Sequence, residues 1–332
     1  MRKILMWILA GWFAAGVSSA FAQTPATNAL AATDLKYGLY IHFGMDTFRH
    51  AGEKGRLLEE RFAPVSVNVK AWTHAAKEAG MTFAVLTAKH ESGFCLWDSR
   101  GYDYDIAHSP FKSDLLADFI AACKAEGIVP GVHYSIPDAY NEGAVRYQGD
   151  VPPPYFNVIK QHLTELNTRY PELRILLLDG SQRFSSDQFD ELSRLVKRLN
   201  PQCAIWNTTG GDQGPHQVTD TVIRSWMWSP NAKLNPAQQL FNKYQRSQSG
   251  GKAFVLNVGP DPSCNIPDNQ IAVLMELKTM IANPPPATPA ATTPEAKPDA
   301  AERLKKVKAL YDQGLINKED YDKKVKEIMD SL

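Results

Sequence analysis

Two short apolar runs in this chain end in side chains that could perform acid–base or nucleophilic chemistry. Residues 81–88 are followed by His90 and Glu91, and the run that ends at Leu178 is followed by Asp179 and a glycine. A carboxylate that follows a buried strand is partly desolvated and still faces an open edge, so Asp179 could act as a nucleophile. The plainer interpretation is that Asp179 caps the next loop and His90 belongs to an ordinary turn.

Two more apolar runs have the same design. Residues 37–44 carry His42 near their end, and residues 128–135 carry His133 and Tyr134. In α/β barrels the polar groups just past the carboxyl ends of the parallel strands line the active site. If these runs are neighbouring parallel strands, their polar ends meet in one place, and the spacing therefore predicts a single site.

The segments between these runs have the periodicity of amphipathic helices. Apolar residues recur at intervals of three and four in 69–79, 113–126, 156–169 and 187–199, with Ser113 and Asp187 as expected N-caps and Gly80 and Gly127 as expected C-cap glycines. Further apolar runs at 203–207, 221–228 and 253–258 precede a last helix over 266–281.

The resulting alternation amounts to about seven strand–helix units between Asp34 and Asn283. We predict an α/β fold, a (β/α)8-type (TIM-like) barrel that is irregular or incomplete. The alternative is an open, doubly wound sheet, but no glycine-rich phosphate loop joins a strand to a helix.

Charge balance narrows the class of partner. Lys plus Arg and Asp plus Glu number 36 each, so no overall field attracts nucleic acid or an anionic membrane. A neutral substrate fits this balance better.

The first 22 residues have the composition of a secretion signal. Arg2 and Lys3 precede an apolar stretch from Ile4 to Val17, and Ala20-Phe21-Ala22 resembles a cleavage site. We expect a mature protein that starts near Gln23, is periplasmic or secreted, and has no membrane association after cleavage. A retained anchor is the alternative, although the apolar stretch is shorter than the roughly 20 residues that span a bilayer.

Four cysteines, Cys95, Cys123, Cys203 and Cys264, are too few and too scattered for a disulfide scaffold or a structural zinc site. We expect buried thiols.

The composition changes after Asn283. Residues 284–300 are rich in Pro, Ala and Thr and predict an exposed linker, so the catalytic barrel should occupy 23–283. Residues 301–332 predict two short amphipathic helices and resemble the small C-terminal module called SHOCT. A piece this small buries little surface alone, so we expect it to dock on a partner or self-associate.

Several motifs together, in their order along the chain, resemble glycoside hydrolase family 29, the α-L-fucosidases. They are Gly38–Gly44, Leu86–His90 with Gly93–Trp97, Tyr104–Asp114, Asp179-Gly180 and Leu256–Pro260. The resemblance covers about residues 34–282 and implies a barrel that cleaves terminal α-L-fucose from a fucosylated glycan with retention of configuration. It implies that Asp179 is the nucleophile and that a second carboxyl group lies ~5–5.5 Å away as acid/base. We expect no cofactor and no metal.

The resemblance also assigns substrate-binding roles. His42 and His90 would hydrogen-bond the sugar hydroxyls and Tyr134 would border the sugar ring, since imidazole and phenol groups both donate and accept hydrogen bonds. Trp97, Trp226 and Trp228 are candidates for aromatic walls, or else they are buried core residues.

The sequence departs from the family pattern around the site. Glu91 stands where the family usually has a second histidine, Leu177 where it has a tryptophan, and Glu60 is what remains of a Glu-Trp pair. The family's acid/base glutamate aligns with Val218. Asp220, two residues later, would face the same side of a strand and is our main acid/base candidate, with Glu91 and Glu60 as alternatives.

Two other functions stay open from the sequence. His42, His90, His133, Glu91 and Asp179 could form the site of a metal-dependent barrel hydrolase, although no His-x-His pair is present. Val218 and the altered sugar contacts favour instead a catalytically degenerate, glycan-binding barrel. The family's usual C-terminal β-sandwich is not recognisable, so we expect a more open mouth.

Overall fold

The computed structural model describes residues 35–145, 148–208, 216–285 and 317–329, with Leu304, Val307, Lys308 and Tyr311. The predicted signal peptide (1–22), nearly all of the predicted linker (284–300) and much of the predicted C-terminal module lie outside the described residues.

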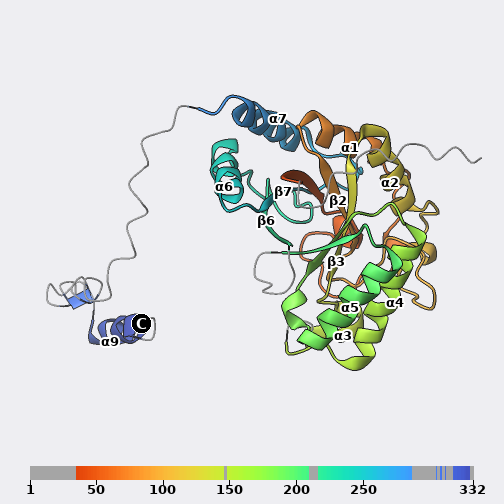
Figure 1. Ribbon diagram of the computed structural model, residues 1–332. Coiled ribbons are helices and arrows are strands. Elements are labelled where there is room, and N and C mark those ends of the chain that lie inside the picture. The colour runs from red at the N-terminus through yellow and green to blue at the C-terminus, as the bar shows by residue number, and fades with distance from the viewer. Residues whose placement is uncertain are drawn as a thin grey trace, which may run out of the picture.

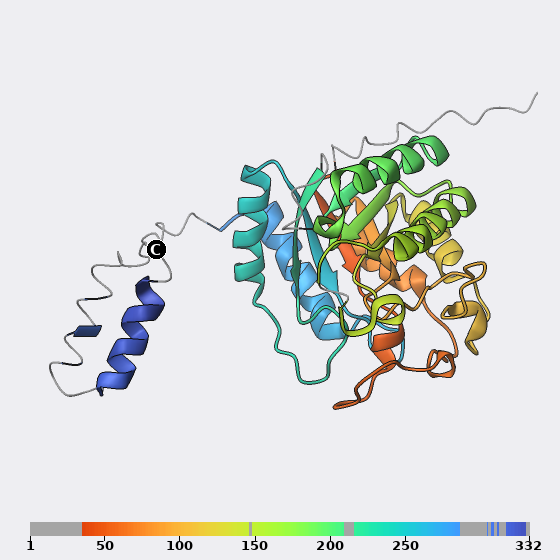
Figure 2. The same cartoon turned by 90° about the horizontal axis from the view of Figure 1, so that it is seen from below.

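Seven parallel strands form a closed barrel in chain order, as the alternation of elements predicted (Figures 1 and 2). β1 pairs with β2 on one side and with β7 on the other, where Tyr37 lies beside Phe254. The strands are β1 (Tyr37–Ile41), β2 (Phe83–Lys89), β3 (Val129–Ser135), β4 (Ile175–Asp179), β5 (Ala204–Asn207), β6 (His216–Val222) and β7 (Ala253–Val258).

Helices surround this barrel (Figure 1). The main ones are α1 (Val69–Glu78), α2 (Leu115–Glu126), α4 (Pro153–Arg169), α5 (Ser186–Leu199), α6 (Ala237–Ser249) and α7 (Asp268–Ala282), and the short α3 (Ala139–Glu142) follows β3. The expected helices are confirmed within three residues at each end. α6 was not among the predicted helices.

Two local predictions were wrong by a few residues. The run 221–228 was read as one strand, but β6 ends at Val222, and Trp226 to Trp228 belong to the loop that follows. The N-caps are Asp114 for α2 and Ser185 for α5, whose side chains accept hydrogen bonds from backbone amides of the first turn. The observed caps lie one residue from the expected Ser113 and two residues from the expected Asp187, because several polar residues precede each helix.

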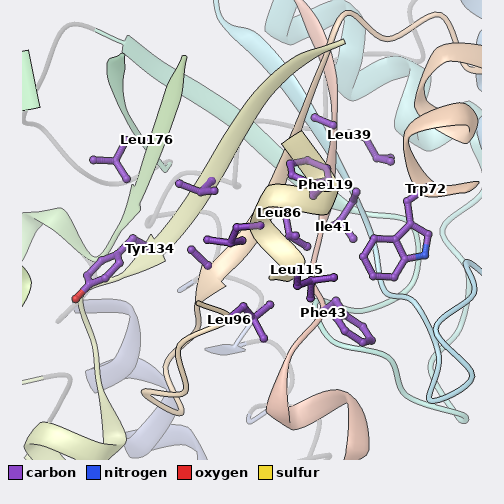
Figure 3. Packing of buried hydrophobic residues seen from close by; sticks show 14 of the residues in the cluster. Leu39, Ile41, Phe43, Trp72, Leu86, Leu96, Leu115, Phe119, Tyr134 and Leu176 are labelled. Carbon is purple, nitrogen blue, oxygen red and sulfur yellow. The ribbon is translucent and has the colours of Figure 1, made fainter. Parts of the chain in front are cut away.

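The apolar core has two parts. One lies inside the barrel and includes Tyr40, Phe83, Leu177, Trp206 and Val218. The other fills the layer between strands and helices and includes Trp72, Phe119 and Tyr134 (Figure 3). Strand side chains alternate between these two layers, so the position of a residue in its strand decides whether it can reach the barrel mouth.

The four cysteines are free thiols, three of them buried and Cys203 half-buried, as the sequence indicated. Near the C-terminus, α9 (Lys318–Met329) is described, and the ring centroid of its Tyr321 lies 4.8 Å from that of Tyr311. Among the residues that the structure describes, no helix combines the length and apolar character needed to cross a bilayer.

Candidate active site

A cavity of about 1660 Å³ opens at the carboxyl ends of the strands. It is lined by residues from the ends of β1, β2, β4, β5 and β6, by the loop of residues 45–61 and by the loop of residues 226–231. This is the end of a parallel barrel at which active sites form.

The polar floor of the cavity follows from strand alternation. Asp179, Thr208 and Asp220 each come two residues after a side chain of the barrel interior, namely Leu177, Trp206 and Val218. Since residues i and i+2 of a strand face the same side, the three polar groups form the next layer up, at the mouth. The geometry is therefore consistent with the prediction that Asp220 and Val218 face the same side of their strand.

Asp179 ends β4 with about half of its side chain exposed to the cavity. The hydroxyl of Thr208 donates a hydrogen bond of 3.0 Å to Oδ1, and Nε2 of His133 lies 3.8 Å from Oδ2. Burial alone raises the pKa of Asp179, but His133, Thr208 and His90 outweigh it and bring the pKa down to about 2. The carboxylate is therefore ionised at neutral pH, as a nucleophile must be.

His42 is buried beneath the cavity, and Asn257 of β7 fixes its tautomer. The side-chain amide of Asn257 donates to the carbonyls of Ser225 and Trp226 at 2.8 and 2.9 Å, so its oxygen accepts from Nδ1 of His42 at 2.5 Å. Burial and the neighbouring imidazoles His90 and His133 hold the pKa of His42 well below its usual value. His42 thus presents an unprotonated Nε2, an acceptor for a ligand hydroxyl.

His90 and His133 complete a cluster of imidazoles with His42. The ring centroid of His42 lies 5.3 Å from that of His90 and 5.4 Å from that of His133, and Tyr40 packs 5.3 Å from His133. The structure therefore brings His42, His90 and Asp179 together as predicted. Tyr40, which faces the same way as His42 two residues later, was missed although that spacing could have indicated it.

Five carboxylates line the cavity within the described residues: Asp46, Glu53, Glu91, Asp179 and Asp220. Two of them are neutralised by arginines, since Arg49 binds Asp46 at 2.6 Å and Arg61 binds Glu53 at 3.1 Å.

Among the acid/base candidates, Asp220 and Glu91 border the cavity, whereas Glu60 does not. Glu60 is exposed in a turn of 3-10 helix (Glu59–Arg61). The expectation for Glu60 therefore finds no support, because the chain before α1 turns the neighbouring Arg61 toward the cavity in its place.

Of the three tryptophans predicted as aromatic walls, two border the cavity and one does not. Trp226 and Trp228 line the cavity, and the Trp226 ring lies 5.1 Å from that of His42. Trp97 is instead buried away from it, where its indole N–H donates to Glu165 of α4 at 2.8 Å.

Tyr134 does not reach the cavity either. It alternates with the inward-facing His133, so its ring lies in the layer between strands and helices (Figure 3), and its hydroxyl bonds Nδ1 of His162 at 2.9 Å. The expectation that Tyr134 borders the sugar ring therefore finds no support, and Tyr40 lines the cavity instead.

A buried ion pair joins two of the loops that carry the site. Nζ of Lys89 lies 3.0 Å from Oδ2 of Asp138, both side chains are fully buried, and Nζ also donates to the carbonyl of Ser135 at 2.7 Å. The amide of Ala139 donates to the carbonyl of Glu91 at 2.7 Å. The strand ends of β2 and β3 are therefore locked together, which fixes His90 and Glu91 relative to α3.

The donor set does not favour a metal centre. Within the part of the chain that is described, no three His, Cys, Asp or Glu side chains converge as ligands would. His42 is committed to Asn257, and His133 faces Asp179.

Comparisons with known proteins agree with this architecture. Residues 56–282 match the family described as alpha-L-fucosidase. Alpha-L-fucosidase 1 of Arabidopsis thaliana is 26% identical over 293 residues, covering 73% of this chain and 57% of that protein. Putative alpha-L-fucosidase 1 of Oryza sativa subsp. japonica is 28% identical over 299 residues, covering 72% and 55%. The chain thus spans little more than half the length of these plant relatives.

Solved structures show the same fold. A putative alpha-L-fucosidase from Bacteroides thetaiotaomicron superimposes with a TM-score of 0.67 at 21% identity, over 75% of this chain and 66% of that one. Alpha-L-fucosidase AlfC from Lactobacillus casei superimposes with a TM-score of 0.63 at 21% identity, over 75% and 96%.

Proposed function

This chain belongs to the alpha-L-fucosidase family, and from that premise we propose that it is a retaining glycoside hydrolase. Its substrate would be a glycan or glycoside that carries a terminal α-L-fucose or a closely related sugar. The observation that carries the proposal is the ionised, half-exposed carboxylate of Asp179 at the mouth of the barrel, held by Thr208 and faced by His133.

In the proposed first step, an oxygen of Asp179 bonds to the anomeric carbon while the glycosidic bond breaks and the leaving oxygen takes a proton from an acid. In the second step, a water oxygen bonds to the same carbon, gives its proton to the conjugate base, and the carboxylate of Asp179 leaves. Each step therefore needs one further group that can lose and regain a proton.

Asp220 is the acid/base that we propose, with Glu91 as the alternative. Asp46 and Glu53 are poor proton donors at neutral pH. Against the effect of burial, His90 and then Arg49 lower the pKa of Asp46, and the backbone amide of His50 and then Arg61 lower that of Glu53. Asp220 faces the barrel axis, and the pKa of Tyr40 is raised first by burial and then by the charges of Asp179 and Asp220. Both carboxylates therefore lie near one phenol, on strands separated only by β5.

The remaining cavity residues suit a neutral polyol. His42 offers an unprotonated nitrogen, His90 borders the cavity, and Trp226 and Trp228 offer aromatic faces to the apolar side of a sugar. The cavity exceeds the ~300–1,000 Å³ of ordinary small-molecule pockets. It leaves room for glycan beyond the cleaved sugar.

The nucleophile is tested by substitution. Asp179→Ala should abolish hydrolysis of an aryl α-L-fucoside, because it removes the carboxylate that attacks the anomeric carbon. Glu60→Ala is the matched control and should keep wild-type rates, since Glu60 lies outside the cavity. Unchanged activity in Asp179→Ala would end this assignment.

The acid/base is tested by leaving-group dependence. Asp220→Ala should lose most activity on alkyl or natural fucosides, retain more on aryl fucosides with good leaving groups, and regain rate with azide, which needs no general base. Glu91→Ala should show none of these signs. If Glu91→Ala shows them instead, the two residues exchange roles.

A second function is favoured by one observation: Val218, where the family's acid/base would align, is apolar and buried inside the barrel. The chain would then bind fucosylated glycans without cleaving them. Calorimetric binding of fucose with no turnover across a panel of aryl glycosides would establish that function and exclude the hydrolase.

We also propose that residues 1–22 direct export to the periplasm or outside the cell, and that residues 301–332 mediate self-association. Support for both comes from the sequence pattern alone.

A further inference from the structure

We infer that His133 and Thr208 are positioning residues for Asp179, each holding one of its two carboxylate oxygens. The inference rests on the proposed role of Asp179 as nucleophile. It adds that these two donors set the ionisation of that carboxylate and assist its departure in the second step.

Thr208 fixes one oxygen by direct contact. It follows β5, two residues after the interior side chain of Trp206, and its hydroxyl donates to Oδ1 of Asp179 at 3.0 Å. A hydroxyl has one proton to donate. That proton is used on the carboxylate, which limits rotation of the Asp179 side chain.

His133 faces the other carboxylate oxygen of Asp179 from a buried position that is unfavourable for an imidazole without hydrogen bonds. Its side chain is 1% exposed, and neither ring nitrogen has a hydrogen-bond partner within the described residues. A buried imidazole without partners is unfavourable, so such a group calls for a specific explanation. Nε2 lies 3.8 Å from Oδ2 of Asp179, a distance that becomes a hydrogen bond after a small movement. Such contacts are often long without substrate and shorten when it binds.

Charged and titratable neighbours determine the protonation states of His133 and Asp179. The groups around His133 are Asp179 at the end of β4, Tyr40 and His42 at the end of β1, and Lys89 and His90 at the end of β2. Burial lowers the pKa of His133 despite the opposing effect of Asp179, whereas Asp179 is ionised at neutral pH. A neutral imidazole facing a carboxylate places its single proton on Nε2, between the two groups.

The consequence for the reaction follows from where negative charge appears. In the covalent intermediate Asp179 is an uncharged ester, and in the second step the bond from its oxygen to the anomeric carbon breaks and the electron pair returns to the carboxylate. Donors on both oxygens stabilise that leaving group. A hydrogen bond to a charged group contributes about 1.5–3 kcal/mol, which corresponds to roughly 10- to 100-fold in rate.

The experiment uses two matched pairs of variants of the full chain. Thr208→Val removes the hydroxyl at nearly constant shape and Thr208→Ser retains it, while His133→Phe removes the donor and His133→Gln keeps an N–H near the position of Nε2. The substrate is an aryl α-L-fucoside with a good leaving group, for which the second step limits the rate. We expect kcat to fall about 10- to 100-fold in Thr208→Val and in His133→Phe. In these two variants KM should fall as well, and intact-mass measurement should show accumulated glycosyl enzyme. Thr208→Ser and His133→Gln should retain most of the wild-type rate.

A second readout does not require turnover. The pKa of the Asp179 carboxyl, followed by carbon NMR and assigned with Asp179→Asn, should rise from about 2 in wild type toward its ordinary value of 3.8 in Thr208→Val and His133→Phe. The pKa that describes the acidic limb of the pH profile of kcat/KM should also rise in these two variants. Circular dichroism establishes that each variant is folded; if His133→Phe does not fold, the Thr208 pair and His133→Gln decide the matter.

The possible failures are distinguishable. If wild type turns over no aryl glycoside, the proposed function fails, and the carboxyl titration alone decides the inference. If wild type is active but Thr208→Val and His133→Phe leave the Asp179 pKa and the intermediate unchanged, the inference is overturned and the hydrolase proposal stands.

Discussion

At the scale of single residues, the barrel buries imidazoles in surroundings that keep them uncharged. His42 borders the cavity, His133 is buried beside Asp179, and His162 packs between Trp97 and Tyr102 in the layer outside β3. Burial lowers the pKa of all three, that of His162 to about 3. Neutral histidines suit an uncharged sugar, and they also make folding depend on pH.

We expect the free energy of unfolding to fall as pH drops below the ordinary histidine value of 6.5. Unfolded chains take up protons there while the folded barrel does not, so each buried imidazole costs about 1.4 kcal/mol per pH unit. His108 acts in the opposite direction because Asp105 raises its pKa, but its ring is exposed and the effect is small. Melting temperatures between pH 7.5 and 5.5 measure the slope.

His162→Phe provides the control for this slope, since it removes one of the three groups without touching the cavity. Its melting temperature should vary less with pH than that of wild type. A wild-type melting temperature that is constant over this range would contradict the argument.

At the scale of elements, the turn after β4 places the nucleophile. Gly180 has φ of 79°, and a Cβ at this position would lie 2.5 Å from Cδ of Pro137. The amide of Ile136 also donates to the carbonyl of Asp179 at 2.8 Å. The ends of β3 and β4 are therefore in tight contact, and only glycine fits directly after the carboxylate.

Gly180→Ala should therefore reduce both stability and kcat/KM. Gly80→Ala is its matched control, because Gly80 has φ of 76° and nothing within 4 Å of an added Cβ. Backbone strain costs both variants about 1–2 kcal/mol. The clash with Pro137 adds about 1–3 kcal/mol in Gly180→Ala alone. Urea unfolding and kinetics on an aryl fucoside measure the two effects, and equal losses in both variants would show that the close contact has no importance.

At the scale of the whole molecule, the barrel closes on itself within residues 37–258, and α7 covers it through Ala282. The strand pairing between β1 and β7 uses no residue from the C-terminal module. The proline-rich segment and residues 301–332 should therefore add nothing to the stability of the barrel.

We expect a chain that ends at residue 285 to keep the melting temperature and kcat/KM of the full chain. Sedimentation of both chains at micromolar concentration tests the proposed self-association, which should disappear on truncation. A lower melting temperature of the shorter chain would show instead that the C-terminal module packs on the barrel.

The sequence by itself indicated the alternation of strands and helices, apart from α6 and the bounds of β6, and the positions of His42, His90, Asp179 and Asp220. These follow from periodicity and from where polar residues interrupt apolar runs, both of which are local. The free thiols were also predicted, because the four cysteines are too few and too scattered for a disulfide scaffold.

Only the tertiary structure decided which polar groups share the mouth. His133 and Tyr134 are adjacent in sequence, and nothing local tells which of them faces the axis; the register with Leu177, two residues before Asp179, settles it. Asn257, Thr208 and the Lys89–Asp138 pair gain their roles from residues on other strands and loops. Barrel closure creates these contacts, because it brings together strand ends that are far apart along the chain.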